Sequence, residues 1–144
     1  MVHITGIRDY EEALRSYEAL SGLGHRAFSF VDRIGEAYSA SDLVVTRSGA
    51  SVIFELAFFS KAMILVPYPF AMSHQTENAN VFAASGAAVI FDEKILSAGV
   101  FKDIILGLFN DRMRLKRLGE NARRLSVPEA SENLAKEVFG LSER

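Results

Sequence analysis

The sequence predicts an α/β fold with three layers, in which a parallel β-sheet lies between two layers of helices. Segments with strand character alternate with helical segments along most of the chain, an order typical of parallel sheets covered on both faces. Two strand segments, Asp42–Thr46 and Met63–Val66, hold apolar runs without polar alternation, as strands buried on both faces do. The 144 residues show no internal repeat and no linker long enough to divide them, so we expect a single domain, residues 1–144.

The first part of the chain predicts two strands and two helices. Short apolar runs indicate strands at Val2–Thr5 and Ala27–Val31. A helix is expected over Tyr10–Leu20, where apolar side chains recur every three residues before a Ser-Gly-Leu-Gly turn. A shorter helix is expected over Ile34–Ser39.

The rest of the chain predicts three strands and then becomes wholly helical. The strands are expected at Asp42–Thr46, Met63–Val66 and Ala87–Phe91. The helices are expected at Ala50–Phe59, His74–Ala84, Ser97–Phe109, Arg112–Leu125 and from Pro128 to about Phe139. Ser73 and Ser97 are suitable N-cap residues, and a proline suits the first turn of the last helix.

Composition excludes several classes of function. The net charge of −2 gives no reason to expect nucleic-acid binding, and the absence of cysteine excludes disulfides and thiolate chemistry. The three histidines, His3, His25 and His74, lack the spacing of a metal site, so we expect no metal. The longest apolar run, Ala62 to Pro67, is far shorter than the ~20 residues that cross a bilayer, and no signal peptide is recognisable. A cytoplasmic location is compatible with these features.

In a doubly wound sheet, ligands bind at the carboxyl ends of the strands. The segment Ser48-Gly49-Ala50-Ser51 joins a buried strand to an apolar helix at such an end. The first N–H groups of a helix have no partner within it, the helix dipole is positive there, and glycine permits close approach of a ligand. The segment can therefore bind a phosphate, with both serine hydroxyls as added donors. The alternative is that Ser48 caps the helix and Gly49 makes a tight turn.

A single acid, Glu55, lies in the apolar helix that follows. It stands four residues after Ser51, so the two side chains share one face of the helix. A carboxylate can accept two hydrogen bonds from a ribose diol, which would fit a nucleotide lying along this helix. The alternatives are that Glu55 pairs with Arg47 or Lys61, or points to water.

The loop after the next strand offers amide groups. Gln75 and Asn78 lie three residues apart at the start of the helix that begins at His74, and amides suit sugar hydroxyls. Helix capping by these polar side chains is the alternative. His74 has no neighbouring carboxylate in the sequence to orient it as a general base. Further along, the charges of Arg112–Leu125 form no single stripe and indicate a solvated helix face.

Residues 48–79 read SGASVIFELAFFSKAMILVPYPFAMSHQTENA, and residues 85–91 read SGAAVIF. This pattern, continued over nearly the whole chain, resembles the carboxyl-terminal domain of the MurG family, glycosyltransferases that add N-acetylglucosamine to lipid I in peptidoglycan synthesis. The resemblance implies a Rossmann-like domain, half of a GT-B fold. It also implies a chain that lacks the first strand and Gly-rich loop of its domain as well as the whole acceptor domain.

The same resemblance implies roles for individual residues. The backbone around Val31 would recognise uracil, with Ile34 packed nearby. Residues 48–51 would hold the diphosphate of UDP-N-acetylglucosamine, and Glu55 would bind the ribose. Gln75, together with His74, would hold the sugar, and Asn78 belongs to the same motif. No cofactor is implied, and transfer would proceed with inversion, the leaving UDP being stabilised at the helix start without a bound metal.

The sequence departs from the family pattern at several positions. Val52 stands in place of the usual threonine, Arg33 in place of an acid, and Ser60 in place of a glycine in the turn before the next strand. Met72-Ser73 replaces an acidic pair before the histidine. The catalytic residues are expected in the absent amino-terminal domain, so we expect this chain alone to be inactive.

The expected partners are a UDP-sugar, an acceptor domain or partner subunit and, through that missing half, a lipid-linked acceptor at the inner face of the plasma membrane. Three other interpretations remain open. The chain can be a subunit of a split glycosyltransferase, a UDP-sugar 2-epimerase-like domain, or a non-catalytic nucleotide-binding module. The epimerases usually carry Ser-Gly-Gly and paired glutamates where this chain has Ser-Gly-Ala and Glu55 alone.

Overall fold

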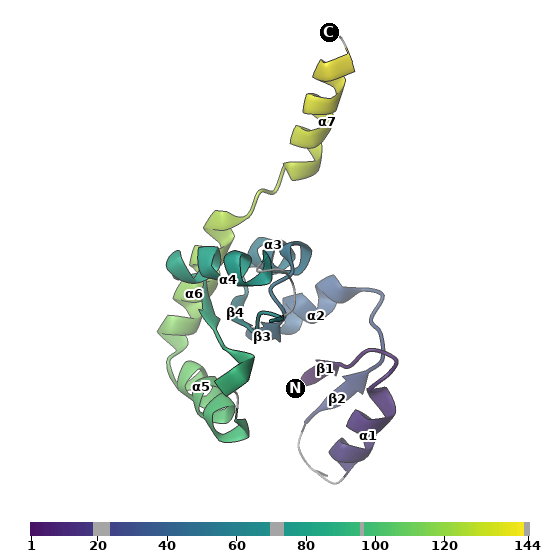
Figure 1. Ribbon diagram of the computed structural model, residues 1–144, viewed down its shortest axis with the longest axis vertical. Helices are drawn as coiled ribbons and strands as arrows, with labels where there is room; N and C mark the ends of the chain where they lie inside the picture. Colours follow the sequence, from purple (N-terminus) through teal and green to yellow (C-terminus); the bar gives the residue numbers. More distant parts are fainter. Residues whose placement is uncertain (19–23, 70–73, 96, 143–144) are drawn as a thin grey trace. The chain divides into compact units, whose positions relative to one another are not determined.

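The computed structural model describes residues 1–18, 24–69, 74–95 and 97–142 (Figure 1). The chain forms two compact units, an amino-terminal unit, Met1–Ala40, and a carboxyl-terminal unit, Ser41–Arg144. The sequence predicted one sheet, whereas the described strands form two parallel sheets, of two and three strands.

The amino-terminal unit contains β1 (Val2–Ile4), α1 (Tyr10–Glu18), β2 (Arg26–Phe28) and α2 (Ile34–Ala40). β1 and β2 pair in parallel, with His3 opposite Ala27. The second strand is shorter than predicted: it ends at Phe28, so Val31 lies just before the turn that leads into α2 instead of in the strand. The predicted end of the first helix, residues 19 and 20, lies outside the described residues.

The carboxyl-terminal unit is built on the sheet β3-β4-β5, in that order. Its strands are β3 (Leu43–Thr46), β4 (Ala62–Leu65) and β5 (Ala88–Ile90). α3 (Ala50–Phe58) connects the first pair and α4 (His74–Ala84) the second, so both pairs are parallel, as predicted. Thr46 lies opposite Leu65 in one pair, and Leu65 opposite Ile90 in the other.

Three longer helices and a short 3-10 helix follow this sheet. They are η1 (Glu93–Ile95), α5 (Ala98–Asn110), α6 (Arg112–Leu125) and α7 (Ala130–Ser142). The Ser97 side chain accepts a hydrogen bond from the Val100 backbone N–H, which confirms the predicted cap of α5. The last helix begins two residues later than Pro128, and its residues 130–141 are all exposed.

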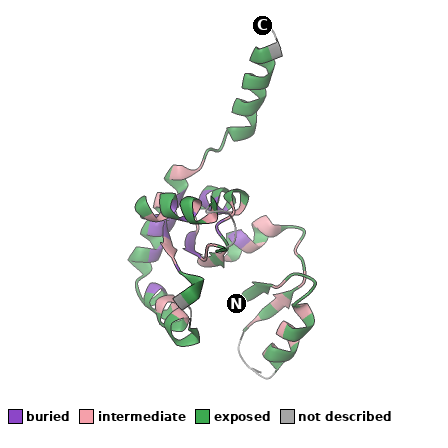
Figure 2. Ribbon diagram, viewed as in Figure 1, coloured by how far each residue is buried: buried purple, intermediate pink, exposed green. Residues whose placement is uncertain are grey.

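The central strand β4 carries the core. All four of its residues are buried, which explains the unbroken apolar run in the sequence (Figure 2). Alternate residues of a strand point to opposite faces, and Ala62 and Ile64 pack in one cluster with Leu108 of α5 and Leu118 of α6. α3 and α4 contact one another through the rings of Phe54 and Phe82, whose centroids are 5.5 Å apart.

The turn between α3 and β4 fits closely against α6. Ser60 has a φ of 56°, in the left-handed region that favours glycine, the residue usual in the family pattern here. The turn is closed by the Lys61 N–H, which donates to the Leu56 carbonyl at 2.9 Å. A Cβ added to Gly119 of α6 would collide with the Ser60 carbonyl oxygen, so a side chain at position 119 would displace this turn.

Candidate functional site

Because β3, β4 and β5 are parallel, their carboxyl ends lie at the same edge of the sheet. The loops that leave this edge contain residues 47–49, residues 66–69 and the residues around Glu93. Most of the residues predicted to form a site lie in these loops and in the helix starts that follow them. Residues 70–73, which include the predicted cap Ser73, lie outside the described residues.

The start of α3 is open. Gly49 occupies the N-cap position with an extended backbone, φ −65° and ψ 140°, and no side chain caps the helix. The structure therefore contradicts the interpretation of Ser48 as the N-cap of this helix. A Cβ built on Gly49 would meet no atom within 4 Å, so space remains beside the first N–H groups of the helix. An exposed serine, Ser51, follows in the first turn.

Ser48 itself is fully buried and joins two helix starts. Its hydroxyl donates to the Gln75 carbonyl oxygen at 2.7 Å, and the Asn78 side-chain amide donates to the Ser48 carbonyl at 3.1 Å. The hydroxyl hydrogen of Ser48 is thus already used within the protein. The predicted phosphate donors at this turn are thereby reduced to the backbone N–H groups and Ser51.

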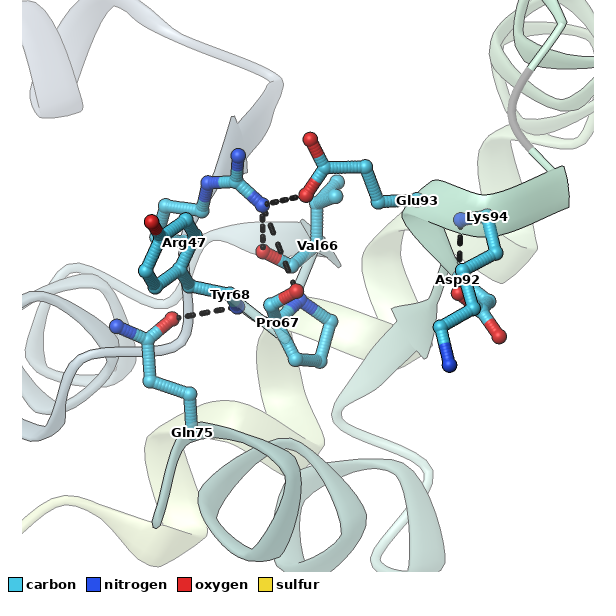
Figure 3. Close-up of polar contacts among 8 residues, drawn as sticks. All are labelled: Arg47, Val66, Pro67, Tyr68, Gln75, Asp92, Glu93 and Lys94. Carbon is cyan, nitrogen blue, oxygen red and sulfur yellow. Dashed lines mark hydrogen bonds and ion pairs between the residues drawn. The ribbon is translucent and has the colours of Figure 1, made fainter. Parts of the chain in front are cut away.

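Gln75 is held at both its backbone and its side chain. Its side-chain carbonyl oxygen accepts a hydrogen bond from the Tyr68 backbone N–H at 2.9 Å, as Figure 3 shows. This contact fixes the rotation of the amide, because the NH2 group must then point the other way. His74, at the first position of α4, is exposed.

Glu55 is exposed on α3, one turn after Ser51, which is also exposed. One of the alternative partners predicted for it, Arg47, pairs instead with Glu93. Lys61, the other, donates to the Ser41 carbonyl at 2.9 Å.

Arg47 was not predicted to have a role of its own. Its guanidinium donates to the Val66 and Pro67 carbonyl oxygens at 3.3 and 3.4 Å and to the Glu93 carboxylate at 2.6 Å, and it lies 5.3 Å from the centroid of the Tyr68 ring (Figure 3). The hydrogen bond between the two side chains lowers the pKa of Glu93 and raises the pKa of Arg47. The sequence held one signal for this ion pair: Arg47 directly follows one strand and Glu93 shortly follows another, and parallel strands end at the same edge of a sheet.

The remaining predicted residues, Val31 and Ile34, lie in the amino-terminal unit, and both are half-buried. Ile34 begins α2, and Val31 lies three residues earlier. Both belong to the segment that follows the end of β2.

Metal binding and membrane crossing each require features that the described residues do not show. Residues 1–18, 24–69, 74–95 and 97–142 contain no group of three or more His, Asp or Glu side chains placed to hold a metal ion. None of the helices in the described part of the chain combines the length and apolarity that crossing a bilayer requires. The basic side chains of α6 are exposed, as predicted for a solvated face.

The chain is similar to a known family of proteins along most of its length. Residues 1–134 match the family described as "Glycosyltransferase family 28 C-terminal domain". A protein of Nitratidesulfovibrio vulgaris (strain DP4) is 41% identical over 131 residues, which cover 90% of this chain and 36% of that protein. It is named UDP-N-acetylglucosamine--N-acetylmuramyl-(pentapeptide) pyrophosphoryl-undecaprenol N-acetylglucosamine transferase. A protein of the same name from Burkholderia orbicola (strain MC0-3) is 38% identical over 140 residues, which cover 94% of this chain and 38% of that protein.

Solved structures agree with these relatives. The crystal structure of Acinetobacter baumannii MurG matches 96% of this chain with a TM-score of 0.87 at 29% identity, and 42% of that chain is covered. A glycotransferase of kitacinnamycin matches with a TM-score of 0.60 at 18% identity, over 94% of this chain and 40% of that one, a likeness of fold alone. The predicted Rossmann-like α/β fold of the GT-B type is confirmed. The chain spans less than two fifths of the length of the curated relatives described above.

Proposed function

The chain belongs to the glycosyltransferase family 28 C-terminal domain family, and on that premise we propose that it is the donor-binding domain of an inverting UDP-N-acetylglucosamine transferase of peptidoglycan synthesis. The relatives are named as transferases of N-acetylglucosamine to a lipid-linked acceptor, and this chain corresponds to a little over a third of them. We assign the acceptor site and the catalytic base to an amino-terminal domain or partner subunit. The whole enzyme would act on the lipid acceptor at the inner face of the plasma membrane.

The observation that carries the proposal is the open start of α3. Gly49 leaves space at the start of α3, at the carboxyl edge of a parallel sheet, where the first N–H groups of a helix have no partner within it and the helix dipole is positive. A diphosphate bound there would receive N–H donors from residues 49–51 and the hydroxyl of Ser51. The same donors would stabilise the negative charge of UDP as it leaves the anomeric carbon.

The other contacts extend the nucleotide-sugar from this point. Glu55 is one turn along α3, exposed, and of the right chemistry to accept two hydrogen bonds from the ribose hydroxyls. The amide NH2 of Gln75, assisted by His74, would donate to the sugar. Asn78 would act indirectly, because its amide holds the Ser48 turn. Val31 and Ile34 would contact uracil.

The first test is calorimetric titration of this chain with UDP, UDP-N-acetylglucosamine and ADP. We expect weak binding that is selective for uridine nucleotides. Glu55→Ala should weaken UDP binding by at least about tenfold, since two hydrogen bonds to a charged acceptor contribute about 1.5–3 kcal/mol each. The matched control is Glu132→Ala on α7, which removes an exposed glutamate remote in sequence from the site and should leave the affinity unchanged.

Two results would contradict the proposal. One is equal affinity for ADP and UDP, which would remove the uracil assignment. The other is unchanged UDP affinity after Glu55→Ala, which would remove the ribose assignment. An assay of sugar transfer to a lipid-linked acceptor by the isolated chain should show no product, and measurable turnover would show that the acceptor machinery lies within these residues.

A further inference from the structure

Arg47 connects three segments that leave the same edge of the sheet. It follows β3, its guanidinium binds the carbonyl oxygens of Val66 and Pro67 after β4, and it pairs with Glu93 after β5. All three contacts are made by one guanidinium nitrogen, Nη1, which lies closest to the Glu93 carboxylate. A lysine ammonium would lack the planar group that lies over the Tyr68 ring.

These contacts converge on the residue that orients Gln75. The carbonyls bound by Arg47 are those of the two residues immediately before Tyr68, and the guanidinium lies over the Tyr68 ring. The Tyr68 backbone N–H in turn donates to the Gln75 side-chain oxygen. A shift of Arg47 would therefore move Tyr68 and release the rotation of the Gln75 amide.

The ion pair is not explained by stability alone. The side chains of Arg47 and Glu93 are 44% and 43% exposed, and pairs of such exposure contribute little to the stability of a fold. Their geometry is more specific than that of the other ion pairs, since the guanidinium also binds two backbone carbonyls and stacks on an aromatic ring.

We propose that Arg47 and Glu93 are positioning residues that hold Tyr68, and through it the Gln75 amide, in the orientation that binds the sugar of a UDP-sugar. This inference rests on the proposed function. The proposal predicts different effects on the two parts of the ligand. The ion pair acts on the residues that would face the sugar, whereas the start of α3 would hold the diphosphate.

The test compares two ligands on the same variants. In the 144-residue chain, Glu93→Gln and Arg47→Lys should lower the affinity for UDP-N-acetylglucosamine about fivefold, the effect of one misplaced neutral hydrogen bond. The affinity for UDP should not fall. Glu120→Gln, which removes the exposed partner of Lys116 within α6, is the matched control and should change neither affinity.

A measurement without ligand examines the positioning step directly. Hydrogen exchange of the Tyr68 amide, followed by NMR, should become faster in Glu93→Gln and stay the same in Glu120→Gln. Unchanged exchange would overturn the inference, as would an equal loss of affinity for UDP and for UDP-N-acetylglucosamine. If the unaltered chain binds neither ligand, the proposed function fails and this inference falls with it; if it binds both and the variants bind like it, only this inference fails.

Discussion

The two units of the chain differ in how their apolar residues are used. In the carboxyl-terminal unit, every residue of β4 is buried, and α3, α4, α5 and α6 all contribute buried side chains. Of the described residues in the amino-terminal unit, Tyr38 alone is buried, while Val2, Ile4 and Phe28 in its strands are exposed. Figure 2 shows the same contrast in the distribution of buried positions.

The difference teaches which parts of the candidate site are fixed by local packing. The proposed diphosphate, ribose and sugar contacts all stand on the sheet with the packed core, and Ser48, Asn78 and Arg47 tie their loops together. The proposed uracil contacts, Val31 and Ile34, belong to the unit with few buried residues. We therefore expect local packing to hold Val31 and Ile34 less firmly than it holds Ser48 and Asn78.

The largest expected effect tests this contrast with one substitution made in both units. Leu65→Ala removes a fully buried side chain from β4 and should lower the free energy of unfolding by about 3 kcal/mol. Leu14→Ala, on the half-buried face of α1, should cost about 1 kcal/mol. Urea titration, followed by NMR signals from each unit, would measure both values. Equal decreases in the free energy of unfolding would contradict the difference in packing between the two units.

A smaller effect tests how tightly the carboxyl-terminal unit is packed. Gly119→Ala places a methyl group against the Ser60 carbonyl oxygen and should destabilise the protein by about 2 kcal/mol. Gly107→Ala, in α5, meets open space and should stabilise it by about 0.5–1 kcal/mol through better helix propensity. Thermal unfolding would measure both, and a stabilising Gly119→Ala would show that the turn yields easily.

The smallest effect concerns acid. The hydrogen bond from Arg47 lowers the pKa of Glu93 below its ordinary value of 4.5, so the pair contributes fully above pH 4.5 and its contribution is lost as the pH falls through the lowered pKa. The measurement is urea unfolding at a series of pH values from about 6 to about 2.5, which roughly spans the carboxyl titrations. The pKa of Arg47 is raised, so its guanidinium stays protonated throughout this range and adds nothing to the pH dependence. As the pH is lowered, the free energy of unfolding should fall less steeply for Glu93→Gln than for Glu120→Gln. Identical slopes would show that the pair is not linked to folding.

Most elements of the fold could be predicted because their signals are local. The helices Arg112–Leu125 and His74–Ala84 have the predicted bounds, and the apolar runs at β3 and β4 identified the buried parallel strands. The end of β2 was not predictable in this way, since the apolar Phe30 and Val31 follow closely although the strand ends at Phe28. Whether the strands join one sheet or two depends on contacts between distant segments, and no local pattern reports them.

The residues of the site were predictable as a group, whereas their mutual contacts were not. The spacing of Gly49, Ser51 and Glu55 on α3 follows from helix geometry alone. The use of the Ser48 hydroxyl and the Asn78 amide inside the protein depends on how close α4 comes to the start of α3, which the sequence does not state. The alternative partners of Glu55 included Arg47, whose actual partner, Glu93, is 46 residues away.

The ion pair of Arg47 and Glu93 also has a consequence for the order of events during folding. Its two residues can meet only after both crossovers of the sheet, through α3 and through α4, have closed, because each belongs to the end of a different outer strand. Contacts between residues so distant in sequence form late, since the entropy of closing the chain must be overcome first. The loop that contacts the Gln75 side chain therefore takes its final shape only when the sheet is complete, and partly folded chains lack the completed form of the proposed sugar site.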